Sequence, residues 1–231
     1  MPFFYMDYWY LILVLPAVLI SLIAQIRVKT TFAKYSTRRV ASGMTGAEAS
    51  QYIQQKNGIH TGLEAVAGEL SDHFDPLSNT IRLSSGVYGQ ATVAAVGVAA
   101  HETGHALQHA QGYNPVILRT KLVPITNFAS GISPILIILG ILLTMDPLAY
   151  AGIALFSVVT LFQLVTLPVE FNASNRAIAA LKESGRFTED EMIGVRKVLT
   201  AAALTYVAAL LVSVMTLLRF ILLVSGNRRD D

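Results

Sequence analysis

His101, Glu102 and His105 have the residue types and the spacing of a zinc-protease helix, in the pattern H-E-x-x-H. Two histidines four positions apart lie on one face of a helix, so both imidazoles can bind a single Zn²⁺ at about 2.0–2.1 Å. The glutamate between them can then take a proton from a water molecule that the zinc activates. The motif therefore predicts a metal-dependent hydrolase. The alternative interpretation is a pair of histidines that only pack on a helix.

The sequence on both sides of this motif favours one continuous helix. No proline lies between Thr92 and Gln111, and Gly112 is a typical residue at a helix end. The turns before the motif are rich in small residues, which allow close packing against neighbouring helices: Ala94, Ala95, Gly97, Ala99 and Ala100. This context favours the metal site over the packing interpretation.

The composition of the chain is that of a membrane protein. Of its 231 residues, 53% are hydrophobic and only 14% are charged, which is too apolar for an ordinary soluble domain of this size. The net charge of +2 and the absence of a basic stripe disfavour nucleic-acid binding, and the chain has no G-x-x-x-x-G-K-[ST] loop for ATP. Because cysteine is absent, zinc must be held by His, Asp or Glu, which is typical of catalytic sites.

Four apolar segments are long enough to cross a bilayer, so we expect a mainly α membrane protein with about four transmembrane helices. The segments lie at about 8–27, 127–145, 148–167 and 203–224. Lysines and arginines are concentrated in the two longer connections, so residues 28–121 and 168–200 are expected to be cytoplasmic and the N-terminus outside. We expect one membrane-embedded domain over residues 1–231, located in the cell membrane.

Between the first apolar segment and the motif helix, the sequence predicts a small zincin-like insert. The capping-box run T-x-x-E that begins at Thr45 should start a helix that ends near Asn57. Residues 59–70 and 80–84 are predicted to form two strands, joined through a turn at 75–79 into a hairpin. An edge strand beside a metal helix commonly aligns an extended substrate by backbone pairing. A purely structural hairpin explains this pattern equally well.

The third metal ligand must come from outside the motif, because catalytic zinc usually has three protein ligands and one water. Glu170 is the best candidate, since it follows Pro168 at the cytoplasmic end of the third apolar segment, where an ionisable residue points to a function. His109 continues the face of the two motif histidines. A third histidine further along one straight helix cannot complete a tetrahedral site, so we expect His109 to pack or to support the ligands.

Three runs of the sequence together resemble the YugP-like family of bacterial membrane-bound neutral zinc metallopeptidases, over nearly the whole chain. These runs are HETGHALQHAQGY at 101–113, LSDHFDPLSNTIRLSSGVYGQATVAAVGVAA at 70–100, and PVEFNASNRA at 168–177. The resemblance implies that the chain hydrolyses peptide bonds with one Zn²⁺ per chain. Polypeptides, especially membrane-associated ones, are the expected substrates.

More distantly, the motif helix and the later E-F-x-A run are similar to the HtpX and CAAX prenyl protease group of gluzincins. In that group the run continues as E-F-x-A-D, and the aspartate supports a zinc histidine. This chain has Ser174 at that position. The supporting contact is therefore expected from Asn172, Ser174 or Asn175, each weaker than a carboxylate.

These residues predict a zinc metalloendopeptidase with Glu102 as general base, and with a transition-state stabiliser among His73, Tyr113 and Arg176. The alternative is a zinc-stabilised membrane scaffold or adaptor without peptidase activity, which the missing aspartate of the E-F-x-A-D run keeps open. A transporter subunit is disfavoured, because within the middle of the apolar segments only Arg219 is ionisable.

Overall fold

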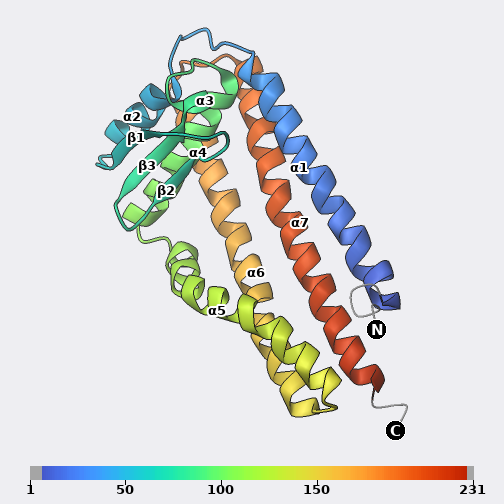
Figure 1. The fold of residues 1–231 in the computed structure, drawn as a ribbon. Helices are drawn as coiled ribbons and strands as arrows, with labels where there is room; N and C mark the ends of the chain where they lie inside the picture. Colours follow the sequence, from blue (N-terminus) through green and yellow to red (C-terminus); the bar gives the residue numbers. More distant parts are fainter. Residues whose placement is uncertain (1–6, 228–231) are drawn as a thin grey trace. The chain divides into compact units, whose positions relative to one another are not determined.

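The computed structural model describes residues 7–227, whose helices and strands are labelled in Figure 1. The chain forms two compact units. One unit comprises Gln25–Ile117 and Pro168–Leu204, and we call it the motif unit because it contains the H-E-x-x-H run. The other, the apolar unit, comprises the described residues up to Ala24, Leu118–Leu167, and those from Thr205 onward. Each unit is described by itself below.

Long apolar helices run through the chain, as predicted for a mainly α membrane protein. Helix α1 spans Leu15–Ser36 after a π-helical turn at Tyr10–Val14, α5 spans Asn114–Leu142, α6 spans Asp146–Glu183, and α7 spans Glu189–Asn227. In the described range these four are long and apolar enough to cross a membrane. The fold prediction of about four spans with a small insert is confirmed.

The turn between α5 and α6 lies just before Asp146-Pro147. Helix α5 ends at Leu142, Thr144 has a positive φ of 51°, and Asp146 already begins α6. Proline suits the first turn of a helix because it has no N–H to donate there. Helix α6 then continues without a break past Pro168, so Glu170 is on the same helix as the apolar residues 148–167.

The short helices begin at the side chains that the sequence indicated. At α2 (Gly46–Lys56), the Thr45 hydroxyl accepts the backbone N–H of Glu48 at 3.2 Å, and the Glu48 carboxylate accepts the N–H of Thr45 at 2.8 Å. This reciprocal pair is the predicted capping box. Helix α4 spans Val93–Ala110, with Thr92 as its N-cap and with Gly112 at a positive φ of 63° just beyond its end. The predicted motif helix is therefore confirmed.

The insert contains a small sheet in which the predicted hairpin is only partly right. Its strands are β1 (Gly62–Val66), β2 (His73–Asp75) and β3 (Thr80–Ser84), in the order β1-β3-β2. The hairpin is formed by β2 and β3, whereas β1 pairs with β3 in parallel. The prediction that residues 59–70 and 80–84 form the hairpin was wrong.

The connection from β1 to β2 explains this difference. The chain leaves β1, passes to the far edge of the sheet, and is held there by Asp72, whose carboxylate accepts hydrogen bonds from the backbone N–H and the hydroxyl of Ser84 at 2.7 and 3.1 Å. These bonds anchor the connection at the end of β3. Strand β2 has only three residues, too few to show a period of two in the sequence.

The two faces of the sheet have different environments. Ile81 and Leu83 are fully buried, and together with Phe74 they pack in one cluster with Ala95 and Ala99 of α4. The motif helix is thus covered by the sheet on one side. Its other buried residues form a second core with α2 and with the parts of α6 and α7 in the motif unit. This core fixes the position of α4.

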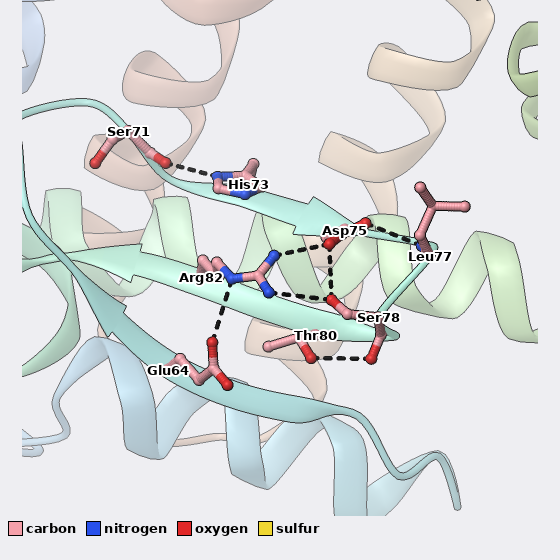
Figure 2. A network of polar contacts seen from close by, with 8 residues as sticks. All are labelled: Glu64, Ser71, His73, Asp75, Leu77, Ser78, Thr80 and Arg82. Carbon is pink, nitrogen blue, oxygen red and sulfur yellow. Dashed lines mark hydrogen bonds and ion pairs between the residues drawn. The ribbon is translucent and has the colours of Figure 1, made fainter.

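On the opposite face of the sheet, Arg82 links all three strands through polar contacts (Figure 2). It donates to the carboxylates of Asp75 at 2.8 Å and Glu64 at 3.2 Å, and to the hydroxyl of Ser78. Hydrogen bonds from Arg82 and Ser78, and from the N–H of Leu77, hold the pKa of the Asp75 carboxyl well below its usual range. The charge of Asp75 therefore stabilises the hairpin.

Replacing Asp75 with Asn should weaken the β2–β3 hairpin. At pH 7 we expect the protection of these amides from hydrogen exchange to fall about two- to fivefold, as for a single surface ion pair. Because the folded pKa of Asp75 is depressed, its stabilisation is complete above the unfolded value of about 3.9 and is lost as the pH falls below it. The wild type should thus lose protection towards pH 2, and the protection of Asp75→Asn should change little with pH.

Glu69→Gln, at an exposed carboxylate before β2, is the control. An equal loss of protection in this variant would contradict the role assigned to Asp75.

Candidate metal centre

Helices α4 and α6 bring three potential ligand side chains together. On α4, the rings of His101 and His105 lie 4.7 Å apart between centroids and are nearly perpendicular, at 83°. The Oε2 atom of Glu170, on α6, lies 3.4 Å from Nε2 of His101 and 3.6 Å from Nε2 of His105. One potential ligand atom from each of the three residues lies within 4.8 Å of the others. Glu170 is almost completely buried, at 2% exposure.

These distances fit a tetrahedral zinc ion. An ion that is 2.0–2.1 Å from each ligand atom holds those atoms about 3.3–3.5 Å apart in a tetrahedron. The observed separations of the Glu170 oxygen from the two imidazole nitrogens, 3.4 and 3.6 Å, are within about 0.3 Å of this value. Two imidazoles and one carboxylate also form a ligand set that catalytic zinc sites use. The residues present therefore fit zinc.

The ligands can meet because α4 and α6 approach each other closely at Gly104. A Cβ atom on Gly104 would lie 2.6 Å from the carbonyl oxygen of Ala173 and 3.2 Å from its Cα. Such distances are not compatible with any side chain at this position. Gly104 lies between the two motif histidines, and Ala173 lies between Glu170 and Ser174. The close contact is therefore at the centre of the site.

The orientation of His105 is fixed by Gln108, one turn further along α4. The Gln108 amide donates to the carbonyl of Val169 at 2.8 Å and to Oδ1 of Asn172 at 3.0 Å. Its own oxygen lies 3.1 Å from Nδ1 of His105. Because both N–H groups of this amide already have acceptors, the oxygen must accept the Nδ1–H of His105. The lone pair of His105 Nε2 is thus directed towards Glu170, as a metal ligand requires.

The Asn172 carboxamide extends this network to the end of α4. Its Oδ1 also accepts a hydrogen bond from Nε of Arg176 at 2.6 Å, and Arg176 donates to Oε1 of Gln111. The Arg176 guanidinium lies 5.9 Å from the ring centre of Tyr113. Arg176 is therefore connected to His105 through Asn172 and Gln108, with Tyr113 beside it.

His101 is held by Ser174 of α6. The Ser174 hydroxyl is buried and lies 3.1 Å from Nδ1 of His101. Among the three residues expected to replace the aspartate of the E-F-x-A-D run, Ser174 makes this contact, and Asn172 contacts Gln108 instead. Asn175 is exposed on α6. A hydroxyl that accepts the Nδ1–H leaves Nε2 of His101 available for a metal.

Two other predicted residues are placed away from the three ligands. His73 is the partner of Arg82 across the β2–β3 pair and shares its face of the sheet, opposite to α4 (Figure 2). Its Nδ1 lies 2.8 Å from the carbonyl oxygen of Ser71. His109 is exposed and contacts the ring of Phe74 at 5.7 Å between centroids. The structure thus does not bring His73 to the site, and it places His109 in contact with β2.

Glu102 is buried in α4 at 9% exposure, and no hydrogen bond to its carboxylate is found among residues 7–227. Burial alone would lower the pKa of His105. In the protonated ring, however, Nε2–H donates to Glu170, and the charges of Glu102 and Glu170 also favour this form, so the pKa is raised. Glu102 is therefore close enough to His105 to act on it electrostatically. Its carboxylate has no structural partner that would prevent it from exchanging a proton.

Gln108 and the Val169 carbonyl were not anticipated from the sequence. Gln108 lies three residues after His105, a spacing at which side chains on a helix contact each other. This spacing was the available signal for Gln108. The contact with Val169 depends on the packing of α6 on α4, which no local pattern records.

Comparison with known proteins identifies the family of the chain. Residues 10–225 match the model of a family described as "Putative neutral zinc metallopeptidase". The chain belongs to this family. It is 46% identical over 223 residues to "Putative membrane protease YugP" of Bacillus subtilis (strain 168), and the match covers 96% of this chain and 99% of that protein. No solved structure matches the chain. The family and the four apolar helices together make the chain a membrane protein of the zinc metallopeptidase class.

Enlarging Gly104 should separate the ligands of this family member. We expect Gly104→Ala to lower zinc affinity at least about tenfold, comparable with the loss of a supporting residue at a metal site, because α6 must move away from α4. Gly97→Ala on the same helix is the matched control, since a Cβ there would meet the Val195 side chain at an ordinary 3.4 Å. Zinc content after competition with a chelator measures the effect. If Gly104→Ala bound zinc with the affinity of the wild type, this prediction would be contradicted.

Removing the hydrogen bonds that orient the histidines should weaken zinc binding without abolishing the fold. We expect Ser174→Ala and Gln108→Leu each to reduce zinc affinity about 10- to 100-fold, the usual effect of losing such partners. Asn175→Ala, at the exposed neighbour of Ser174 on α6, should bind zinc like the wild type. Competition with a fluorescent zinc chelator gives the three affinities. An Asn175→Ala defect equal to that of Ser174→Ala would assign the effect to α6 as a whole.

Proposed function

We propose that this chain is an integral-membrane zinc metalloendopeptidase that hydrolyses peptide bonds at the cytoplasmic face of the cell membrane. The observation that carries this proposal is the position of the buried Glu170 carboxylate, 3.4 and 3.6 Å from the two motif imidazoles. His101, His105 and Glu170 would hold one zinc ion per chain. Membrane polypeptides, or segments close to the membrane, are the proposed substrates.

Glu102 is the proposed general base. A zinc ion bound to the three ligands would supply a Lewis acid that polarises the scissile carbonyl and makes a water molecule a nucleophile near neutral pH. Glu102 takes the proton of the attacking water and delivers it to the nitrogen of the leaving amine. Its buried carboxylate is suited to this, because it is not occupied by a hydrogen bond from the described part of the chain.

Arg176 is proposed as a positioning residue rather than as the transition-state stabiliser. Its Nε and one terminal nitrogen already donate to Asn172 and Gln111, and through Asn172 it supports the amide that orients His105. Tyr113, half-buried beside the Arg176 guanidinium, is then the proposed stabiliser of the developing oxyanion.

An extended substrate is proposed to pair with β2. In the order β1-β3-β2 this strand is at an edge of the sheet, so one side of its backbone is available for pairing. Phe74 of β2 contacts His109, which lies one turn beyond His105 on α4. A peptide that adds to this edge therefore runs along the motif helix.

The scaffold alternative is less consistent with the site. A protein that uses zinc only for stability gains nothing from the burial of a carboxylate that makes no hydrogen bond, because such burial costs free energy. Glu102 is such a carboxylate among the described residues. The aspartate that is missing from the E-F-x-A-D run would support a histidine ligand. In this chain Ser174 makes a hydrogen bond to His101 instead.

Replacing Glu102 with Gln tests the proposed chemistry. Because Gln cannot accept the proton of the water, we expect peptidase activity on casein or a quenched peptide to fall about 10²- to 10⁴-fold. Zinc content should stay at the wild-type value, because Glu102 is not a ligand. Glu189→Gln, at the exposed start of α7, is the control and should remain active.

The outcomes of this experiment separate the two functions. A metal-loaded, inactive Glu102→Gln protein supports the general base. Loss of zinc together with activity would assign Glu102 a structural role. A true peptidase should cleave the substrate, lose this activity with a chelator, and regain it with zinc. If the purified wild type shows no such cleavage, the scaffold function would be favoured instead.

A further inference from the structure

A cavity of about 290 Å³ lies in the motif unit, between the last turns of α1 and the first turns of α7. Beside the side chains of Tyr35, Ala201 and Leu204, its walls carry four cationic side chains and two threonine hydroxyls. These residues are Arg27, Lys34, Arg196, Lys197, Thr31 and Thr200. We call this space the basic cavity.

The basic cavity is built by two facing polar stripes. On α1, Arg27, Thr31 and Lys34 are spaced by four and three residues and therefore lie on one face of the helix. On α7, Lys197 and Thr200 are three positions apart and therefore also share a face of their helix. Just beside them the two helices touch, because the Tyr35 ring packs on Gly194 so closely that a Cβ there would lie 2.8 Å from the ring. The four cationic side chains are exposed, so they lie at the open side of this contact between the two helices.

The positive charge of the basic cavity is not neutralised by the protein. No carboxylate lines it, and none of its four cations forms a salt bridge within residues 7–227. Like charges around one small space repel each other, and an anion between them removes this cost. The cavity is therefore suited to a negatively charged ligand that also accepts hydrogen bonds.

The sequence positions of these residues indicate where the ligand lies. Residues 8–26, before Arg27, contain no charged side chain, and residues 198–218, after Lys197, contain none either. In a membrane protein, the boundary between an uncharged apolar stretch and the first Lys or Arg is at the level of the lipid headgroups. Both helices reach this boundary at the basic cavity.

We propose that the basic cavity binds the phosphate of an anionic phospholipid headgroup. The four cations contact the phosphate oxygens, and the hydroxyls of Thr31 and Thr200 donate hydrogen bonds to them. Leu204, which also lines the cavity, lies on the side of the apolar stretch of α7 and contacts the start of the acyl chains. This site is independent of the metal centre. Soluble phosphate esters share the headgroup chemistry, so the experiment must separate the two sources.

Lipid retention by the full chain tests this proposal. The purified protein is delipidated in detergent, given phosphatidylglycerol or phosphatidylcholine, and analysed by native mass spectrometry. We expect the wild type to retain phosphatidylglycerol at least about tenfold more than phosphatidylcholine. The variant Arg27→Gln/Lys34→Gln/Arg196→Gln/Lys197→Gln should lose this preference. The double variant Lys34→Gln/Lys197→Gln should show an intermediate loss.

The control variant removes the same number of positive charges at exposed residues that do not line the basic cavity. It is Lys29→Gln/Arg39→Gln/Lys121→Gln/Lys182→Gln. It should retain phosphatidylglycerol like the wild type. Unchanged zinc content shows that each variant is folded. Retention by the cavity variant, or an equal loss in the control, would overturn the proposal.

A second arm adds inorganic phosphate and measures thermal unfolding. We expect phosphatidylglycerol to raise the unfolding temperature of the wild type and inorganic phosphate not to raise it. In the cavity variant, phosphatidylglycerol should no longer have this effect. Equal stabilisation by phosphate alone, also lost in that variant, would overturn the lipid as the ligand and assign the cavity to a soluble phosphate ester.

Discussion

The close contact between Gly104 of α4 and Ala173 of α6 is the constraint on which the site depends. A Cβ at position 104 would lie 2.6 Å from the Ala173 carbonyl oxygen, so only glycine permits this approach. Ala173 and Ser174 lie three and four positions after Glu170 on α6. Gly104 and His105 lie three and four positions after His101 on α4. Each helix therefore presents its contact residue and its functional residues on one face. When the backbones meet at Gly104, Glu170 and Ser174 reach the two imidazoles.

The electrostatics of the site follow from this geometry. The Glu170 carboxylate is buried at 2% exposure, a position that costs free energy unless positive charge or hydrogen bonds compensate for it. Two imidazole Nε2 atoms face it, and a zinc ion held by the three groups would provide the compensation. The partners behind the imidazoles, Ser174 and Gln108, are neutral. They fix the ring orientations but add no negative charge, so the charge of a bound metal would be offset by Glu170 and by the nearby Glu102.

The sequence was sufficient for features that depend on local patterns. Thr45 and Thr92 mark the helix starts, and Gly112 follows the end of α4. Glu170 was predicted as a third ligand from its position after Pro168, and the structure places its carboxylate beside both motif imidazoles. Features that depend on long-range packing were not predictable in this way. The parallel pairing of β1 with β3 depends on Asp72, which holds the connection at the end of β3, and β2 is too short for a periodic signal. The amide of Gln108 has a role only because Val169 and Asn172, more than 60 positions later, pack against it.

The continuity of α6 connects the chemistry of the site to its membrane setting. Pro168 removes one backbone donor, yet the helix runs from Asp146 to Glu183 without a break. Glu170 therefore follows the apolar residues 148–167 by three positions in one helix, and no flexible linker lies between the membrane segment and the ligand. A substrate of the proposed peptidase would have to reach a ligand that follows directly, along α6, on the end of the apolar stretch. The continuity of α6 thus supports the proposal that the substrates are polypeptide segments close to the membrane surface.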